Sequence, residues 1–154
     1  MDNREILFRG KCTDTGRWYE GQYIHLHKTT YCFKEDYDRN PDNDIHQIVF
    51  EEMMDWGLPN RHLRADVLPE TVGQYTGLTD KNGKKIFEGD IIKGCEYDDI
   101  YFVKYFADDN YPAFDVVPEM NTECNGLSHL IIVEGIEVIG NIHDNPELLK
   151  GGAE

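Results

Sequence analysis

Short segments in which apolar and polar residues alternate follow one another through the first quarter of the chain. Residues 4–9 alternate in this way, and residues 17–26 form a second such segment after a turn signal at residues 13–16. A third segment, residues 29–34, is rich in Thr, Tyr and Phe. Because a period of two places alternate side chains on opposite faces of a pleated strand, this pattern predicts an antiparallel meander.

The pattern changes after the polar loop that follows. Apolar positions from residue 45 onward fit one face of a helix, and Asp44 precedes them as a candidate N-cap. Gly57 and Pro59 predict that this helix ends in a firm turn. We therefore expect a helix over residues 45–56, and a strand over residues 45–50 is the alternative that the same residues allow.

The clearest local signal is a hairpin punctuated by glycines. Asn82-Gly83 is the dipeptide preferred in type I′ turns, where both central residues have positive φ. Gly77 and Gly89 flank this turn, and the side chain of Asp90 is placed to bond back to the backbone of the preceding turn. A Glu-Gly-Asp run before a β-branched pair is typical of a strand opening in small SH3-like barrels.

The remaining chain predicts further strands and one helix. Residues 100–106 are apolar on both faces, which predicts a strand covered on both sides by sheet or by a partner. Residues 113–117 lie between prolines and predict a short or edge strand, and residues 130–133 and 136–142 predict two more. Residues 144–149 predict a short helix with proline in its first turn. The fold class is therefore mainly β, with short antiparallel strands in a meander and a small SH3-like barrel or sandwich, and one or two short helices.

The hairpin and both ends of the chain carry motifs of a known family. The blocks are Gly73-Gln74-Tyr75-Thr76-Gly77-Leu78, Asp80-Lys81-Asn82-Gly83-Lys84, Ile86-Phe87-Glu88-Gly89-Asp90-Ile91-Ile92, Arg4-Glu5-Ile6-Leu7-Phe8-Arg9-Gly10 and Val138-Ile139-Gly140-Asn141-Ile142-His143-Asp144-Asn145-Pro146-Glu147-Leu148-Leu149. These blocks are spread over the chain from end to end, and through them the sequence resembles the YopX family.

That resemblance implies a phage or prophage protein of a bacterial host, mainly β, with no established biochemical function. It carries over no catalytic, cofactor-binding or metal-binding residue. We expect a single YopX-like domain over residues 1–154, with a possible N-terminal β lobe at 1–34, an acidic insert at 35–70 and a C-terminal barrel-like part at 71–154.

Acidic residues outnumber basic residues by two to one. Thirty Asp and Glu against 15 Lys and Arg give a net charge of −15, which argues against direct binding to nucleic acid or to an anionic membrane. No apolar run approaches the about 18 residues of a membrane span, and the first residues lack the apolar stretch of a signal peptide. We therefore expect a cytoplasmic protein, in the cytosol of a bacterial host.

The acidity is concentrated in two stretches, residues 35–70 with a net charge of −7 and residues 95–154 with −11. Asp98-Asp99 and Asp108-Asp109 stand out within the second stretch. Such a face could imitate a nucleic-acid backbone and occupy a DNA- or RNA-binding protein of the host. A solvated surface that keeps the protein soluble is the plainer interpretation.

Few residues offer catalytic or metal-binding chemistry. The four cysteines, Cys12, Cys32, Cys95 and Cys124, form no close pair, so we expect reduced thiols that behave as small hydrophobes. Ser128-His129 and His143-Asp144 are adjacent pairs that strand geometry and helix capping explain without catalysis. We therefore expect no active site and no cofactor.

His25 and His27 are the one pair with the spacing of metal ligands. They lie two residues apart on a predicted strand, so their side chains share a face. A third ligand such as His46, His62 or a carboxylate would have to converge on them, and surface or half-buried histidines are the commoner interpretation.

We expect a non-enzymatic phage accessory module that acts through contact with a protein partner or as a homo-oligomer. One alternative is an acidic decoy that mimics nucleic acid and binds a host DNA- or RNA-binding protein. A second alternative is a metal-dependent enzyme that uses His25 and His27.

Overall fold

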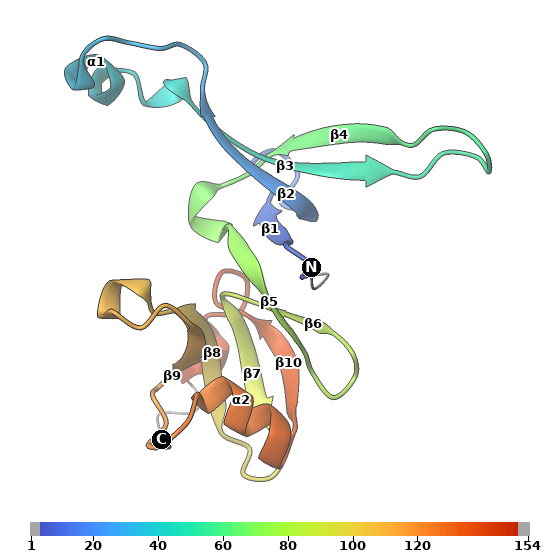
Figure 1. The fold of residues 1–154 in the computed structure, drawn as a ribbon, viewed down its shortest axis with the longest axis vertical. Helices are drawn as coiled ribbons and strands as arrows, with labels where there is room; N and C mark the ends of the chain where they lie inside the picture. Colours follow the sequence, from blue (N-terminus) through green and yellow to red (C-terminus); the bar gives the residue numbers. More distant parts are fainter. Residues whose placement is uncertain (1–3, 151–154) are drawn as a thin grey trace. The chain divides into compact units, whose positions relative to one another are not determined.

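The computed structural model describes residues 4–150, which fall into two compact units (Figure 1). The N-terminal unit comprises residues 6–72, and the C-terminal unit comprises the remaining residues on either side of it. Both are built mainly from antiparallel strands, which confirms the mainly β class. The described strands close no barrel, and no described helix has the length and apolar character needed to cross a membrane.

The sheet of the N-terminal unit has the order β4-β3-β2-β1 with every neighbouring pair antiparallel. Its strands are β1 (Phe8–Lys11), β2 (Trp18–His27), β3 (Asp44–Glu52) and β4 (Arg61–Asp66). The prediction of a strand over residues 17–26 is confirmed by β2. Segment 35–70, expected as an acidic insert, supplies β3 and β4 to the same sheet as β1 and β2.

The predicted helix over residues 45–56 is wrong, because this segment forms β3. Ile48 is fully buried and lies opposite Tyr23 of β2 on one side and Ala65 of β4 on the other. A strand with partners on both sides satisfies its backbone in two ladders, and this outweighs the helical spacing of its apolar residues. The predicted turn after it is confirmed, since Leu58 N–H donates to the Asp55 carbonyl at 3.0 Å.

The predicted strand over residues 29–34 is also wrong. This segment is a loop that leads into α1 (Lys34–Arg39), followed by the 3-10 turn η1 (Pro41–Asn43). The buried side chain of Asn43 accepts a bond from the backbone N–H of Thr29 and donates to its carbonyl, at 2.8 and 2.9 Å. Side chains therefore satisfy backbone groups that a strand ladder would otherwise need. A further 3-10 turn, η2 (Pro69–Thr71), ends the unit.

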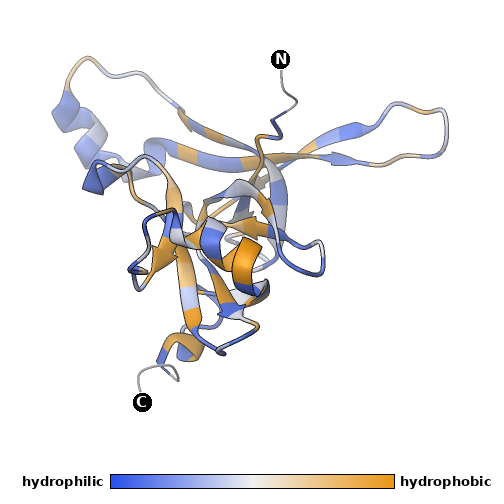
Figure 2. Cartoon of the chain, turned by 60° about the horizontal axis from the view of Figure 1, so that its bottom comes forward, coloured by the Kyte–Doolittle hydropathy of each residue, from blue (hydrophilic) through white to orange (hydrophobic). Residues whose placement is uncertain are grey.

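The C-terminal unit contains a four-stranded sheet of order β10-β7-β8-β9 and the hairpin β5–β6. The strands are β5 (Gly73–Thr79), β6 (Lys85–Phe87), β7 (Asp90–Gly94), β8 (Ile100–Tyr105), β9 (Phe114–Val117) and β10 (Ile136–Asn141), with the 3-10 turn η3 (Ala107–Asp109) after β8. Its core residues are Ile86, Ile92, Val103, Val116, Leu127, Leu130, Ile136 and Val138. Apolar residues gather on these strands and on the helix beside them, whereas α1 is hydrophilic (Figure 2).

Most strands of this unit were predicted, including β9 at the edge of its sheet. The strand predicted over residues 130–133 is wrong, because the segment continues α2 (Gly126–His129) as the π-helical turn η4 (Leu130–Glu134). Leu127 and Leu130 are buried three residues apart, and the side chain of Asn125 caps the helix by accepting a bond from Ser128 N–H. The short terminal helix is α3 (Glu147–Lys150).

The turn between β5 and β6 is organised by Asp80 rather than by a type I′ geometry. Gly83 has a φ of 79°, but Asn82 is not among the described residues with positive φ, so the type I′ prediction is wrong. The carboxylate of Asp80 accepts bonds from the backbone N–H groups of Asn82, Lys84 and Val138 at 2.9, 2.9 and 3.1 Å. One buried carboxylate thus holds the turn and ties it to β10.

The turn between β6 and β7 follows its prediction. The Asp90 side chain, which is 1% exposed, accepts a bond from Phe87 N–H at 2.8 Å. Gly89 supports this turn with a φ of 88°, a backbone conformation that residues with a Cβ atom rarely adopt.

Candidate functional site

Two neighbouring strands of the N-terminal unit bring three histidines and an aspartate to one face of the sheet. His25 of β2 lies opposite His46 of β3, and His27 lies opposite Asp44. Residues directly opposite in an antiparallel pair share a face, as do residues two apart on one strand. The register of β2 and β3 therefore places all four side chains in one patch, which we call the histidine cluster (His25, His27, Asp44 and His46).

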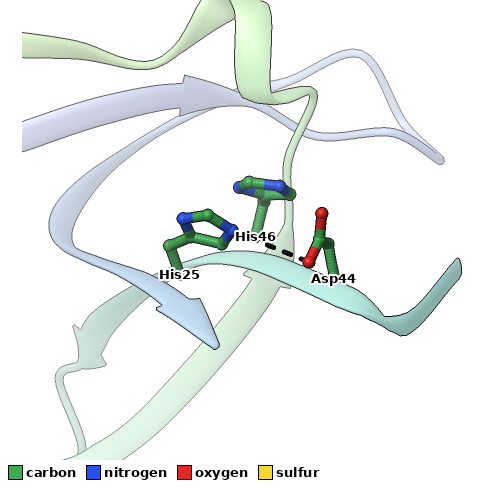
Figure 3. Close-up of side chains that lie close together, drawn as sticks. All are labelled: His25, Asp44 and His46. Atoms are coloured by element: carbon green, nitrogen blue, oxygen red, sulfur yellow. Dashed lines mark ion pairs between the residues drawn. The ribbon is translucent and has the colours of Figure 1, made fainter. Parts of the chain in front are cut away.

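Three members of the histidine cluster converge closely. His25, Asp44 and His46 each offer one ligand atom, and these atoms lie within 4.8 Å of one another. The imidazoles of His25 and His46 stack with their centroids 4.3 Å apart, and His25 Nε2 lies 3.9 Å from Asp44 Oδ1. Figure 3 shows the stacked rings of His25 and His46, with the carboxylate of Asp44 beside them.

Two short contacts hold members of the histidine cluster in place. The Tyr23 hydroxyl lies 2.5 Å from His46 Nδ1, and His27 Nδ1 lies 2.8 Å from Asp44 Oδ1. Burial, reinforced by the negative charge of Asp44, raises the pKa of Tyr23 above its usual value, so the phenol stays protonated at neutral pH. Asp44 and His46 are thereby each oriented by a second side chain.

The members of the histidine cluster differ in their exposure to solvent. His46 is half-buried, whereas His25, His27 and Asp44 are exposed. Asp44 and His46 line an open cleft of about 670 Å³ whose other lining residues include Thr13 and Asp66. The cluster is thus accessible to small solutes, and its ligand atoms are the nitrogen and oxygen donors of a metal site or of a hydrogen-bonded polar patch.

The sequence named three of the four members of the histidine cluster as candidate ligands and gave the fourth only as an unspecified carboxylate. His25 and His27 share a face as expected, and of the suggested third ligands His46 joins them while His62, opposite Glu51 on β4, does not. Asp44 was predicted as a helix N-cap, which hid its position opposite His27. Only the strand register of β3 could have revealed the pairing, and that register is a property of the assembled sheet.

A second feature is the outer part of the hairpin formed by β3 and β4. The pairing of β2 with β3 ends at Val49, so the rest of β3 pairs with β4 alone. The hairpin of β3 and β4 therefore extends past the end of β2 (Figure 1). Glu52 and Arg61 form an ion pair across it. Gly57 has a φ of 81° in the turn that closes this extension. We call residues 50–62 the hairpin arm.

The end of the hairpin arm exposes large apolar side chains. Trp56 is 100% exposed, Met53 is 86% exposed and Leu58 is 57% exposed. A single exposed apolar residue on a protein surface is ordinary, but three within six residues at the end of one hairpin form a patch. Tryptophan is also the residue most enriched where protein interfaces carry their binding energy.

The cysteines are free thiols, as expected, but only Cys12 is buried. Cys32, Cys95 and Cys124 are exposed, so the prediction that all four act as small hydrophobes holds for one of them. His129 does not pair with Ser128 through its side chain, and its Nδ1 instead lies 4.0 Å from Cys124 Sγ. At that distance the contact is weak, and it was not predicted because five residues of helix and loop separate the two.

The acidic residues singled out in the C-terminal unit are partly neutralised. Lys93 Nζ lies 3.1 Å from Asp98 Oδ1, and Lys104 Nζ lies 3.4 Å from Asp109 Oδ2. The described side chains thus present a mixed surface at these positions instead of an uninterrupted row of negative charge.

Comparison with known proteins identifies relatives for nearly the whole chain. The family model described as "YopX protein" matches residues 7–150. The crystal structure of protein EF1440 from Enterococcus faecalis is similar at 26% identity, covering 94% of this chain and 98% of that one with a TM-score of 0.53. No curated protein matches the sequence. Since the family model spans almost all of the chain, this protein belongs to the YopX family.

Proposed function

We propose that this protein is a non-catalytic accessory module of a phage or prophage, and that it binds a partner protein through the end of the hairpin arm. The observation that carries the proposal is the complete exposure of Trp56 at the turn of that arm. Met53 and Leu58 extend the apolar surface on either side of it.

The energetics favour an interface at this position. A tryptophan buries roughly 150–250 Å² when it enters a pocket, which at about 25 cal/mol per Å² gives about 4–6 kcal/mol before the costs of association. A two-stranded extension is itself marginal in water without a third strand or a packed face. Docking would therefore bury the apolar patch and support the hairpin arm at the same time.

We propose a partner of a different kind from this chain, with an apolar pocket for Trp56 and a neutral or basic rim around it. A second copy would carry the same net charge of −15, and the repulsion between two such chains opposes self-association at low salt. The decoy alternative is less favoured, because lysines already pair with Asp98 and Asp109 on the acidic stretch.

Site-specific photocrosslinking tests the proposal directly. A benzophenone amino acid replaces Trp56 in one version of the chain and Tyr97, an exposed aromatic residue of the C-terminal unit, in the matched control. Irradiation in host cells is expected to give a discrete crosslinked species from position 56 and none from position 97, with the second protein identified by mass spectrometry.

The mass of the crosslinked species separates the possible partners. A product at about twice the 17.9 kDa of the chain would mean that a second copy is the partner, and would overturn the proposal of a different protein. The absence of any discrete product from position 56, or identical products from both positions, would contradict the interaction role itself.

A further inference from the structure

The histidine cluster lies at the start of β3, at the opposite end of the strand from the hairpin arm. We propose that His25, Asp44 and His46 form a binding site for one divalent transition-metal ion, with Zn²⁺ as the best match. Such a site would hold the ion whether or not Trp56 docks on a partner.

The distances between the donor atoms are close to those that a bound ion requires. With metal–ligand bonds of about 2.0–2.2 Å, tetrahedral coordination places neighbouring donors about 3.4 Å apart. His25 Nε2 and Asp44 Oδ1 are 3.9 Å apart, and all three donors lie within 4.8 Å of one another. The His25 and His46 rings are stacked with an interplanar angle of 20°, so coordination requires the His25 ring to turn until its nitrogen points to the same position as the donors of His46 and Asp44. The exposure of His25 permits this rotation.

The backbone holds the three residues in a fixed relation. His25 and His46 are directly opposite in the ladder, and Asp44 lies two residues from His46 on the same strand. Ile48, fully buried two residues further along β3, anchors this part of the pairing in the interior of the unit. The donors therefore come from a paired β-ribbon and not from a loop, which limits the entropy lost when they converge on an ion.

The supporting contacts match those that metal sites use. Metal-bound histidines commonly direct their second ring nitrogen to an oxygen, which fixes the tautomer and the ring orientation. Tyr23 takes this place for His46, because its hydroxyl lies 2.5 Å from Nδ1 and leaves Nε2 for the ion. His27 bonds to the Asp44 carboxylate at 2.8 Å and orients it in the same way.

The donor set selects the class of metal. Two imidazole nitrogens and one carboxylate oxygen suit Zn²⁺, Co²⁺, Ni²⁺ and Cu²⁺, whereas Mg²⁺ and Ca²⁺ prefer sites made of oxygen alone. Three protein ligands leave at least one position for water, and two of the three residues, His25 and Asp44, are exposed. An ion bound here would thus remain in contact with solvent.

The proposal is tested by isothermal titration calorimetry, in which ZnCl₂ or CoCl₂ is added to the untagged, metal-free full chain. The wild-type chain is expected to bind one ion of either metal. His25→Gln, Asp44→Asn and His46→Gln should each weaken binding at least about tenfold. Two control variants should leave binding unchanged. His62→Gln removes an exposed histidine of the same sheet outside the histidine cluster, and Cys32→Ser removes an exposed thiol that lines the same cleft as His27.

A second measurement keeps the test valid if a variant is poorly folded. Zn²⁺ should raise the midpoint of thermal unfolding of the wild-type chain, and a chelator should reverse that rise. The circular dichroism spectrum of each variant shows whether it retains the fold. Metal binding that survives in folded His25→Gln and Asp44→Asn variants, or the absence of binding by the wild-type chain, would overturn the site.

Discussion

At the scale of single residues, buried polar groups decide how the C-terminal unit is held together. Asp80 is 7% exposed and accepts three backbone bonds, one of which comes from β10, 58 residues further along the chain. Burial by itself would raise the pKa of Asp80, but the bonds from Val138, Lys84 and Asn82 outweigh it, and the pKa lies below its usual value. The ionised carboxylate is thus a structural element.

Replacing Asp80 should therefore destabilise the C-terminal unit. Asp80→Ala leaves three backbone donors without a partner and is expected to cost about 3 kcal/mol or more in the free energy of unfolding, measured by urea denaturation. Asp109→Asn, at an exposed ion pair, should change stability by less than about 1 kcal/mol. Equal stability of the two variants would refute the role of Asp80.

The same carboxylate predicts a dependence of stability on pH. Because the folded pKa of Asp80 is lowered, its contribution is complete above the unfolded pKa of about 3.9 and is lost as pH falls through the lower folded pKa. Urea midpoints measured at pH 5, 4 and 3 should fall more steeply for the wild-type chain than for Asp80→Asn. Parallel curves for the two proteins would contradict this assignment.

The complete exposure of Trp56 can be tested in the isolated protein, without a partner. The chain has two tryptophans, and Trp18 is half-buried with the Arg9 guanidinium 5.0 Å from its ring centroid. Acrylamide should quench the fluorescence of Trp18→Phe, which reports Trp56, more strongly than that of Trp56→Phe. Trp56→Ser should also leave the free energy of unfolding within about 0.5 kcal/mol of wild type, since the side chain buries nothing.

At the scale of elements, the sequence predicted strands where alternation and turn residues coincide. It identified β2, the edge strand β9 and the turn of the hairpin arm, because these depend on local preferences. The sequence-based prediction failed at β3, because the two flanking strands decide the conformation of that segment. It also failed at residues 130–133, because burial of Leu130 on a helical face decides the conformation there. The sequence named His25, His27 and His46 as candidate ligands. It did not name Asp44, because the segment that begins there was expected to be a helix with Asp44 as its N-cap.

The pairing of β2 with β3, which supports both the histidine cluster and the hairpin arm, depends on Gly21. A Cβ added there would lie 2.0 Å from the Val49 carbonyl oxygen, a backbone atom that cannot move without breaking the ladder. Gly21→Ala should lower the stability of the N-terminal unit by about 2 kcal/mol or more. Tryptophan fluorescence reports this unit alone, because Trp18 and Trp56 both belong to it.

Gly94→Ala is the matched control for that substitution. The atom that its Cβ would approach, at 2.7 Å, is the carboxylate end of Glu134, a flexible side chain that can rotate away. We expect at most a small loss of stability from this variant, measured for both variants by circular dichroism, because Gly94 belongs to the C-terminal unit, which contains neither tryptophan. A loss as large as that of Gly21→Ala would show that the backbone contact at Val49 is not the cause.

At the scale of the whole molecule, the two units differ in charge and in core. From the sequence, the N-terminal unit carries a net charge of −4 and the C-terminal unit −11. The buried apolar residues of the N-terminal unit are few among those described: Cys12, Ile48, Ala65 and Val67. The larger core lies in the C-terminal unit.

This imbalance predicts different local stabilities. Amide hydrogens in β7, β8 and β10 should exchange with solvent more slowly than those in the hairpin arm, because opening the larger core exposes more apolar surface. Hydrogen exchange followed by mass spectrometry of peptides from the full chain measures this difference. Equal protection of the hairpin arm and β7 would contradict it.

The central claim is that the end of the hairpin arm binds a protein partner. The most direct measurement is the dissociation constant of the partner captured from position 56, determined for the wild-type chain, for Trp56→Ser and for the control Tyr97→Ser. Loss of a central tryptophan contact of about 2 kcal/mol or more predicts at least about a 30-fold weaker complex for Trp56→Ser and wild-type affinity for Tyr97→Ser. Equal affinities for all three proteins would contradict the account.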